Sequence, residues 1–183
     1  PIVSMMDGSV YAHEALIRGP QGTPLHTPDA LMRAAADEGL GYEFEYACLI
    51  AALRTWGSLR MVGRLFVNIS ANALTHLHGQ QGSDDLLKLV GSMGVAARML
   101  VLEITEHERV ADMDHLADVV RQLRTLGMSL ALDDFGDGRS SLRLWSELRP
   151  EIVKIDKYFI KNIHEEAVKV QTLRGLMHFA QLF

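Results

Sequence analysis

Short apolar segments recur along the chain, and each ends on a polar side chain able to bind a metal ion or a phosphate. Segments with helical patterns separate them, so strand and helix alternate after an opening hairpin, which predicts parallel strands joined by helical crossovers. Polar side chains at the carboxyl ends of parallel strands are typical of the active face of a (β/α)8 barrel. A doubly wound open sheet is the alternative, but no glycine-rich phosphate turn follows the first strand. The strand-end residues are Glu14, Asn68, Glu103, Asp133 with Asp134, and Lys154 with Asp156.

Local signals predict the individual elements. Asp7-Gly8 lies between two extended segments, 2–3 and 9–16, and predicts a hairpin turn. Thr27 followed by Pro28 indicates the start of a helix. Further strands are expected at 65–67, 99–102, 129–132 and 152–156, and helices at 27 to 39 or 41, 43–56, 83–93, 113–126, 142–148 and from 165 onward.

Asp133 and Asp134 are adjacent at the end of a predicted buried strand. Successive strand side chains point to opposite faces, so both carboxylates reach one site only if the strand begins to turn there. Gly136 and Gly138 allow such a turn. Two neighbouring carboxylates raise each other's pKa unless a cation lies between them, which favours a hard divalent metal ion. The alternative is an Asx-rich turn whose acids cap the following helix.

The overall composition limits the classes of partner. A chain of 183 residues with 48% hydrophobic side chains suffices for one domain with a substantial core. The net charge of -5 and the scattered basic residues argue against DNA as a partner. The single Cys48, expected in the core, fits a reducing, cytoplasmic compartment, and no apolar run approaches the ~18 residues of a membrane span. Because the chain starts at Pro1 without a methionine, we expect a fragment of a longer protein.

The polar strand ends belong to five ordered motifs: Glu14-Ala15-Leu16, Val67-Asn68-Ile69-Ser70, Glu103-Ile104-Thr105-Glu106, Asp133-Asp134-Phe135-Gly136 and Lys154-Ile155-Asp156. In order and spacing they closely resemble the EAL domain, the bacterial signalling phosphodiesterase domain that hydrolyses cyclic di-GMP. The resemblance covers essentially the whole chain. It implies a modified TIM-type (β/α)8 barrel whose first strand runs antiparallel to its neighbours. It also implies conversion of cyclic di-GMP to the linear dinucleotide pGpG with magnesium or manganese.

The resemblance implies a set of metal ligands. Glu14, Asn68, Glu103 and Asp133 would hold one metal ion, while Asp133 and Asp134 would hold the second. All of these ligands are oxygens, which independently favours magnesium, manganese or calcium over zinc. Glu14 and Asp133 are also expected to take part in catalysis.

The remaining matches concern catalysis, substrate and loop support. Lys154 is expected to be catalytic, acting on the attacking water or on the developing phosphoryl charge, and its alternative is an ion pair with Asp156. Arg18 resembles the family arginine that contacts a ligand phosphate, and its alternative is an ordinary surface arginine. Leu16 and Asp156 are expected to bind substrate. Glu106 resembles a glutamate that supports the loop after Asp134, and its alternative is to cap the next helix.

The chain departs from the family pattern in two ways. The family loop usually reads Asp-Asp-Phe-Gly-Thr-Gly-Tyr-Ser-Ser, whereas Asp137 and Arg139 replace the threonine and the tyrosine here. The family also continues past Phe183 into two more strands, which carry a glutamate of the second metal site. Since a closed barrel typically needs about 250 residues, we expect 1–183 to be a single EAL-type barrel domain that is incomplete at its C-terminus.

Two functions remain open at this stage. Retention of every ligand position from Glu14 to Asp156 favours a metal-dependent phosphodiesterase. The altered loop favours a catalytically degenerate domain that acts as a cyclic di-GMP receptor or protein-interaction module. The expected partners are cyclic di-GMP, a second copy of the chain in a homodimer, and a sensory or GGDEF-type domain in the parent protein.

Overall fold

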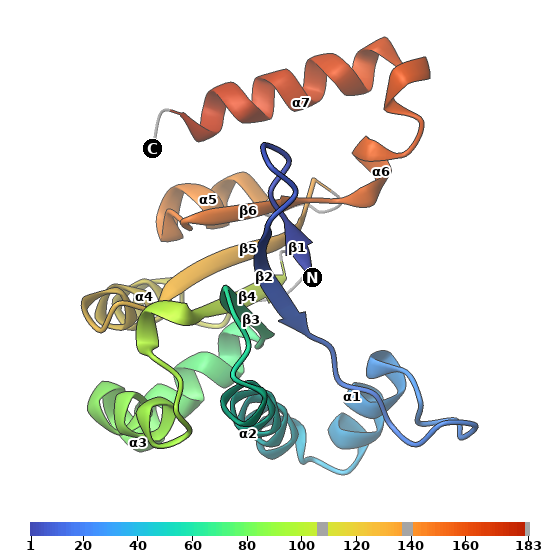
Figure 1. Cartoon of the computed structure of the whole chain (residues 1–183). Helices are drawn as coiled ribbons and strands as arrows, with labels where there is room; N and C mark the ends of the chain where they lie inside the picture. Colours follow the sequence, from blue (N-terminus) through green and yellow to red (C-terminus); the bar gives the residue numbers. More distant parts are fainter. Residues whose placement is uncertain (106–109, 137–140, 182–183) are drawn as a thin grey trace.

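The computed structural model describes residues 1–105, 110–136 and 141–181. Within these ranges six strands form one curled sheet in the order β1-β2-β3-β4-β5-β6 (Figure 1). β1 runs antiparallel to β2, and each later pair of neighbours is parallel. This is the predicted modified TIM-type arrangement, with its antiparallel first strand. The strands are β1 (Ile2–Val3), β2 (Val10–Ala15), β3 (Arg64–Asn68), β4 (Leu100–Thr105), β5 (Ser129–Phe135) and β6 (Ile152–Ile155).

Helices form the crossovers between the parallel strands and cover the outer side of the sheet (Figure 1). No helix in the described ranges is long and apolar enough to span a membrane. The α-helices are α1 (Pro28–Asp37), α2 (Gly41–Leu59), α3 (Ala71–Ser92), α4 (Met113–Thr125), α5 (Ser141–Leu148), α6 (Lys157–Ile160) and α7 (Ala167–Ala180), and the 3-10 helices are η1 (Ala97–Met99) and η2 (Ile163–Glu165).

The predicted hairpin and most predicted helices are confirmed, with two exceptions. α3 begins at Ala71 rather than at 83, because Ser70 caps it by accepting a hydrogen bond from the Ala73 backbone N–H at 3.0 Å. Gly82 then breaks the helical backbone with φ of 73°, so the predicted start at 83 is the second half of a kinked helix. The short helix α6 was not predicted; the Asp156 carboxylate caps it.

The sheet has two chemically different faces, since side chains two residues apart along a strand share a face. The outer face packs against the helices in the larger core, for example through Leu102 and Leu132. The other face carries a small buried cluster contributed by strands alone. Glu14 and Glu103 each lie two residues beyond a member of that cluster, so they extend the same face with carboxylates. The cluster is Ala12, Phe66, Val101 and Ala131, flanked by Ile2 and Ile152.

Helix α2 passes so close to the end of α3 that only glycine fits at position 57. A Cβ on Gly57 would lie 2.0 Å from the Met93 carbonyl oxygen. We expect Gly57→Ala to lower the free energy of unfolding by about 1–3 kcal/mol, because the two backbones must move apart. Gly91→Ala is the matched control, since a Cβ there meets nothing within 4 Å. It should stabilise α3 by about 0.5–1 kcal/mol, and equal denaturation midpoints for the two variants would contradict this packing.

Candidate metal centre at the carboxyl ends of the strands

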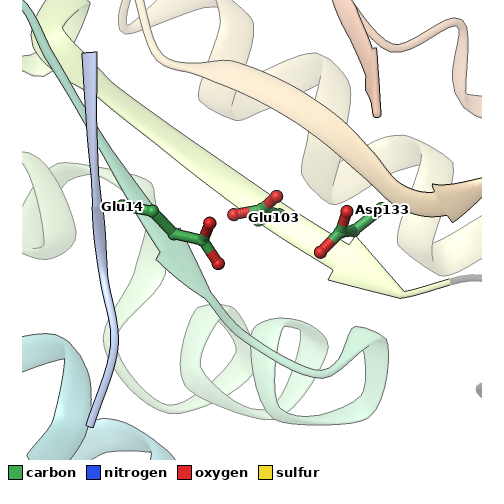
Figure 2. A group of neighbouring side chains, drawn as sticks. All are labelled: Glu14, Glu103 and Asp133. Carbon is green, nitrogen blue, oxygen red and sulfur yellow. The ribbon is translucent and has the colours of Figure 1, made fainter. Parts of the chain in front are cut away.

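Three carboxylates from three strands converge at one end of the sheet. Glu14 of β2, Glu103 of β4 and Asp133 of β5 each offer an oxygen, and these oxygens all lie within 4.8 Å of one another. Figure 2 shows the three side chains pointing toward a common space. Like charges this close repel, so a cation among them stabilises the arrangement.

Lys154 of β6 supplies that cation in the protein itself. Its Nζ lies 3.3 Å from Glu14 Oε2 and 3.0 Å from Asp133 Oδ2, and it forms an ion pair with Glu103 Oε1. Burial opposes a charge on Lys154, but hydrogen bonds and charge interactions with Glu103 and Asp133 outweigh burial and raise its pKa. The ammonium group is therefore charged at neutral pH. The alternative of an ion pair with Asp156 is wrong.

Glu103 is the most enclosed member of the cluster, with no exposed surface. Burial raises the pKa of Glu103 from 4.5 to about 7, although the hydrogen bond and charge of Lys154 lower it. Apart from the Lys154 ion pair at Oε1, no donor among the described residues reaches its buried carboxylate oxygens. Burying such a carboxylate costs free energy unless a further partner binds it, and a bound metal ion is a suitable partner.

Asn68 ends β3 beside this cluster. It is paired in register with Glu103, and its Nδ2 donates a hydrogen bond to Glu14 Oε1 at 3.1 Å. The amide is exposed to solvent. Asn68 thus lies beside the three carboxylates, with an amide that also carries a neutral oxygen.

Asp133 and Asp134 lie in a bulge of β5. Leu132 pairs with Val153 and Phe135 with Ile155, so the two aspartates together face only one residue of β6. Asp134 has φ of 51°, a left-handed conformation that aspartate tolerates better than most residues. The strand therefore turns here, as a bulge within the strand, but only Asp133 of the two belongs to the carboxylate cluster. Residues 137–140, between this pair and α5, lie outside the described ranges, so the helix-capping alternative stays a prediction.

A cavity of about 740 Å³ opens beside the cluster and runs between β2 and α2. Its described lining includes the candidate ligands and Leu16, which is 54% exposed, but neither Arg18 nor Asp156. Arg18 is exposed, and its guanidinium donates to the Ile17 carbonyl at 2.8 Å. Asp156 accepts a hydrogen bond from the Tyr158 backbone N–H at 2.6 Å.

The remaining predicted residues are either outside the described ranges or placed differently from the prediction. Glu106, Asp137 and Arg139 lie outside the described ranges, so their predicted effects on the loop stay predictions. Cys48, expected in the core, is only half-buried and lines the cavity. Glu45, which no motif singled out, also lines it and holds the turn after Asn68.

The curled sheet with oxygen ligands at the carboxyl ends of its strands defines a class: barrel proteins with a candidate divalent-metal centre. Comparison with known families is more specific. The chain belongs to the EAL domain family, whose model matches residues 1–183.

Two curated relatives and one solved structure illustrate the likeness. The chain is 30% identical over 183 residues to the cyclic di-GMP phosphodiesterase NbdA of Pseudomonas aeruginosa, covering 99% of this chain and 23% of NbdA. It is 32% identical over 163 residues to the probable cyclic di-GMP phosphodiesterase PdeB of Escherichia coli, covering 87% of this chain and 31% of PdeB. The chain therefore spans less than a third of either relative.

The solved structure is the Klebsiella pneumoniae BlrP1 complex with manganese and cyclic di-GMP. Its TM-score to this chain is 0.83 at 28% identity, covering 96% of this chain and 44% of BlrP1. A calcium complex of BlrP1 with the same dinucleotide has a TM-score of 0.82.

Proposed function

We propose that this domain hydrolyses cyclic di-GMP to linear pGpG and that the reaction depends on magnesium or manganese. The observation that carries the proposal is the convergence of Glu14, Glu103 and Asp133 around Lys154 in a chain of the EAL family. The named relatives and the BlrP1 complexes support the same substrate.

The residues fit a divalent cation. The metal-binding atoms are oxygens, and the buried oxygens of Glu103 have no hydrogen-bond donor among the described residues apart from the Lys154 ion pair at Oε1. Glu14, Asn68, Glu103 and Asp133 would hold one ion, and Asp133 with Asp134 would contribute to a second. When bound, such ions would polarise a phosphoryl oxygen and lower the pKa of a water molecule.

The chain's own residues have separate roles in this proposal. Lys154 is held in its charged form, so it donates hydrogen bonds to the negative charge that develops on the phosphoryl group rather than accepting a proton. Arg18 and Leu16 lie on the segment that follows Glu14 in β2, where Arg18 would bind a phosphate of the dinucleotide. Asp156 would bind substrate from the segment after β6.

Metal substitution tests the proposal. With magnesium or manganese, the protein should convert cyclic di-GMP to pGpG, measured by liquid chromatography of the products. With calcium, turnover should fall at least about tenfold while the dinucleotide still binds, because calcium has longer bonds and looser geometry. Titration calorimetry measures the binding of cyclic di-GMP, and protein freed of metal by a chelator is the control.

The outcomes separate the two candidate functions. Equal turnover in calcium and magnesium would contradict the proposed metal-dependent mechanism. Binding of cyclic di-GMP without turnover in any metal would identify the domain as a receptor instead.

A further inference from the structure

Glu45 of α2 forms a polar contact with the turn that follows β3. The Ser70 backbone N–H donates to Glu45 Oε2 at 2.5 Å, and the Ser70 hydroxyl donates to Glu45 Oε1 at 2.8 Å. Both carboxylate oxygens of Glu45 thus accept hydrogen bonds from the same residue, and both bonds are partly buried. Hydrogen bonds to an ionised carboxylate are stronger than those between neutral groups, so this is a firm link between α2 and the turn.

The link lies two residues beyond Asn68, a candidate metal ligand. The intervening Ile69 is held from the other side, because its backbone N–H donates to the Glu103 carbonyl at 3.0 Å. Ser70 in turn caps α3 through the Ala73 N–H at 3.0 Å. The backbone after Asn68 is therefore fixed by β4 on one side and by α2 on the other.

Asn68 depends on this bracing because its own side chain is exposed. An exposed amide is not held by packing, and its contact with Glu14 Oε1 at 3.1 Å is a single hydrogen bond. The position of its backbone thus decides whether the amide group stays beside the carboxylates. A shift of the turn at Ser70 would move Asn68 directly.

We propose that Glu45 is a positioning residue of the metal centre, which acts through Ser70 to hold Asn68 against Glu14 and Glu103. The inference rests on the proposed function only in taking Asn68 as a metal ligand. Residues that orient metal ligands typically change metal affinity about 10–100-fold when they are replaced. Glu45 does not touch the reacting atoms in this scheme, so metal affinity is the property it should control.

Binding of manganese in the absence of dinucleotide is the test, measured from the electron paramagnetic resonance signal of free Mn²⁺. Glu45→Gln keeps the size of the side chain but replaces one of the two accepting oxygens by an NH₂ group, which cannot accept a hydrogen bond from Ser70. We expect it to weaken Mn²⁺ binding about 10–100-fold. Glu43→Gln is the matched control, since Glu43 lies on the same helix and is exposed, and it should bind Mn²⁺ as the wild type does.

A double-mutant cycle with Ser70→Ala tests whether Glu45 acts through Ser70. Ser70→Ala removes the hydroxyl, which also caps α3, and leaves the backbone hydrogen bond to Glu45. It should therefore weaken Mn²⁺ binding less than Glu45→Gln does. The double variant should bind Mn²⁺ about as well as Glu45→Gln alone, because coupled residues are not additive. If Glu45→Gln fails to fold, weaker Mn²⁺ binding by folded Ser70→Ala still supports the link, and unchanged binding overturns it.

Direct measurement of Mn²⁺ separates this inference from the proposed activity. A wild-type protein that binds Mn²⁺ without hydrolysing cyclic di-GMP would contradict the proposed function, yet the comparison of Glu45→Gln with Glu43→Gln would still decide the inference. Wild-type Mn²⁺ affinity in a folded Glu45→Gln variant would overturn it, and so would the absence of Mn²⁺ binding by the wild type.

Discussion

Replacing Lys154 with methionine is expected to lower kcat for cyclic di-GMP hydrolysis by about 10²–10³-fold, the range found when one preorganised donor is removed from a developing charge. Methionine keeps much of the length of the side chain but cannot carry charge. The ammonium group that lies 3.0 Å from Asp133 and 3.3 Å from Glu14 is then lost. Product analysis under saturating Mn²⁺ measures the change.

Lys157→Met is the matched control for Lys154→Met. Lys157 is exposed at the start of α6, three residues further along the chain, and its replacement should leave kcat unchanged. If Lys154→Met retained wild-type kcat while the protein stayed folded, Lys154 would be only a counter-ion of the carboxylates, without a part in the chemistry.

The strands and the polar residues near their carboxyl ends were predictable because their signals are local. An apolar run followed by a polar residue identifies each strand without knowledge of the partner strand, although β4 and β5 continue two residues past their first acidic residues. The parallel order followed from the alternation of strand with helix, and the hairpin followed from Asp7-Gly8. Convergence of Glu14, Glu103 and Asp133 is then a consequence of topology, since the carboxyl ends of parallel strands meet at one edge.

The parts that were missed depend on contacts between distant segments. β5 continues through Phe135 because β6 offers Ile155 as a partner beyond the bulge, and nothing before residue 136 signals that pairing. The first half of α3 had a cap at Ser70, but the polar stretch before Gly82 obscured its helical period. Glu45 was missed for the same reason, because Ser70 lies 25 residues away and only the fold brings the two together.

Replacing Glu103 with glutamine is expected to have opposite effects on activity and stability. Glutamine retains one oxygen but no charge, so metal-dependent turnover should fall at least about 100-fold, more than is typical for a residue outside the ligand set. The metal-free protein should become more stable at pH 8, because burial raises the pKa of Glu103 even with Lys154 beside it, and the variant no longer buries this charged carboxylate. Function at this position thus has a cost in stability.

The pH dependence of unfolding gives the sign and size of that cost. The pKa of Glu103 is about 7 in the folded protein and near its ordinary 4.5 when unfolded, so between these values the folded state binds more protons. Stability of the metal-free wild type must then fall as pH rises through this window. The shift corresponds to a loss on the order of 3 kcal/mol.

Glu103→Gln should lack this contribution, so the stability difference between variant and wild type should be small near pH 4 and should grow until about pH 7. Denaturant titrations in a chelating buffer at several pH values measure the difference. Added Mn²⁺ should remove it by stabilising only the wild type, because a ligand stabilises the state that binds it. A stability difference that stays constant across this pH range would mean that burial does not raise the pKa of Glu103 toward 7. A variant stabilised by Mn²⁺ as much as the wild type would show that Glu103 is not a metal ligand.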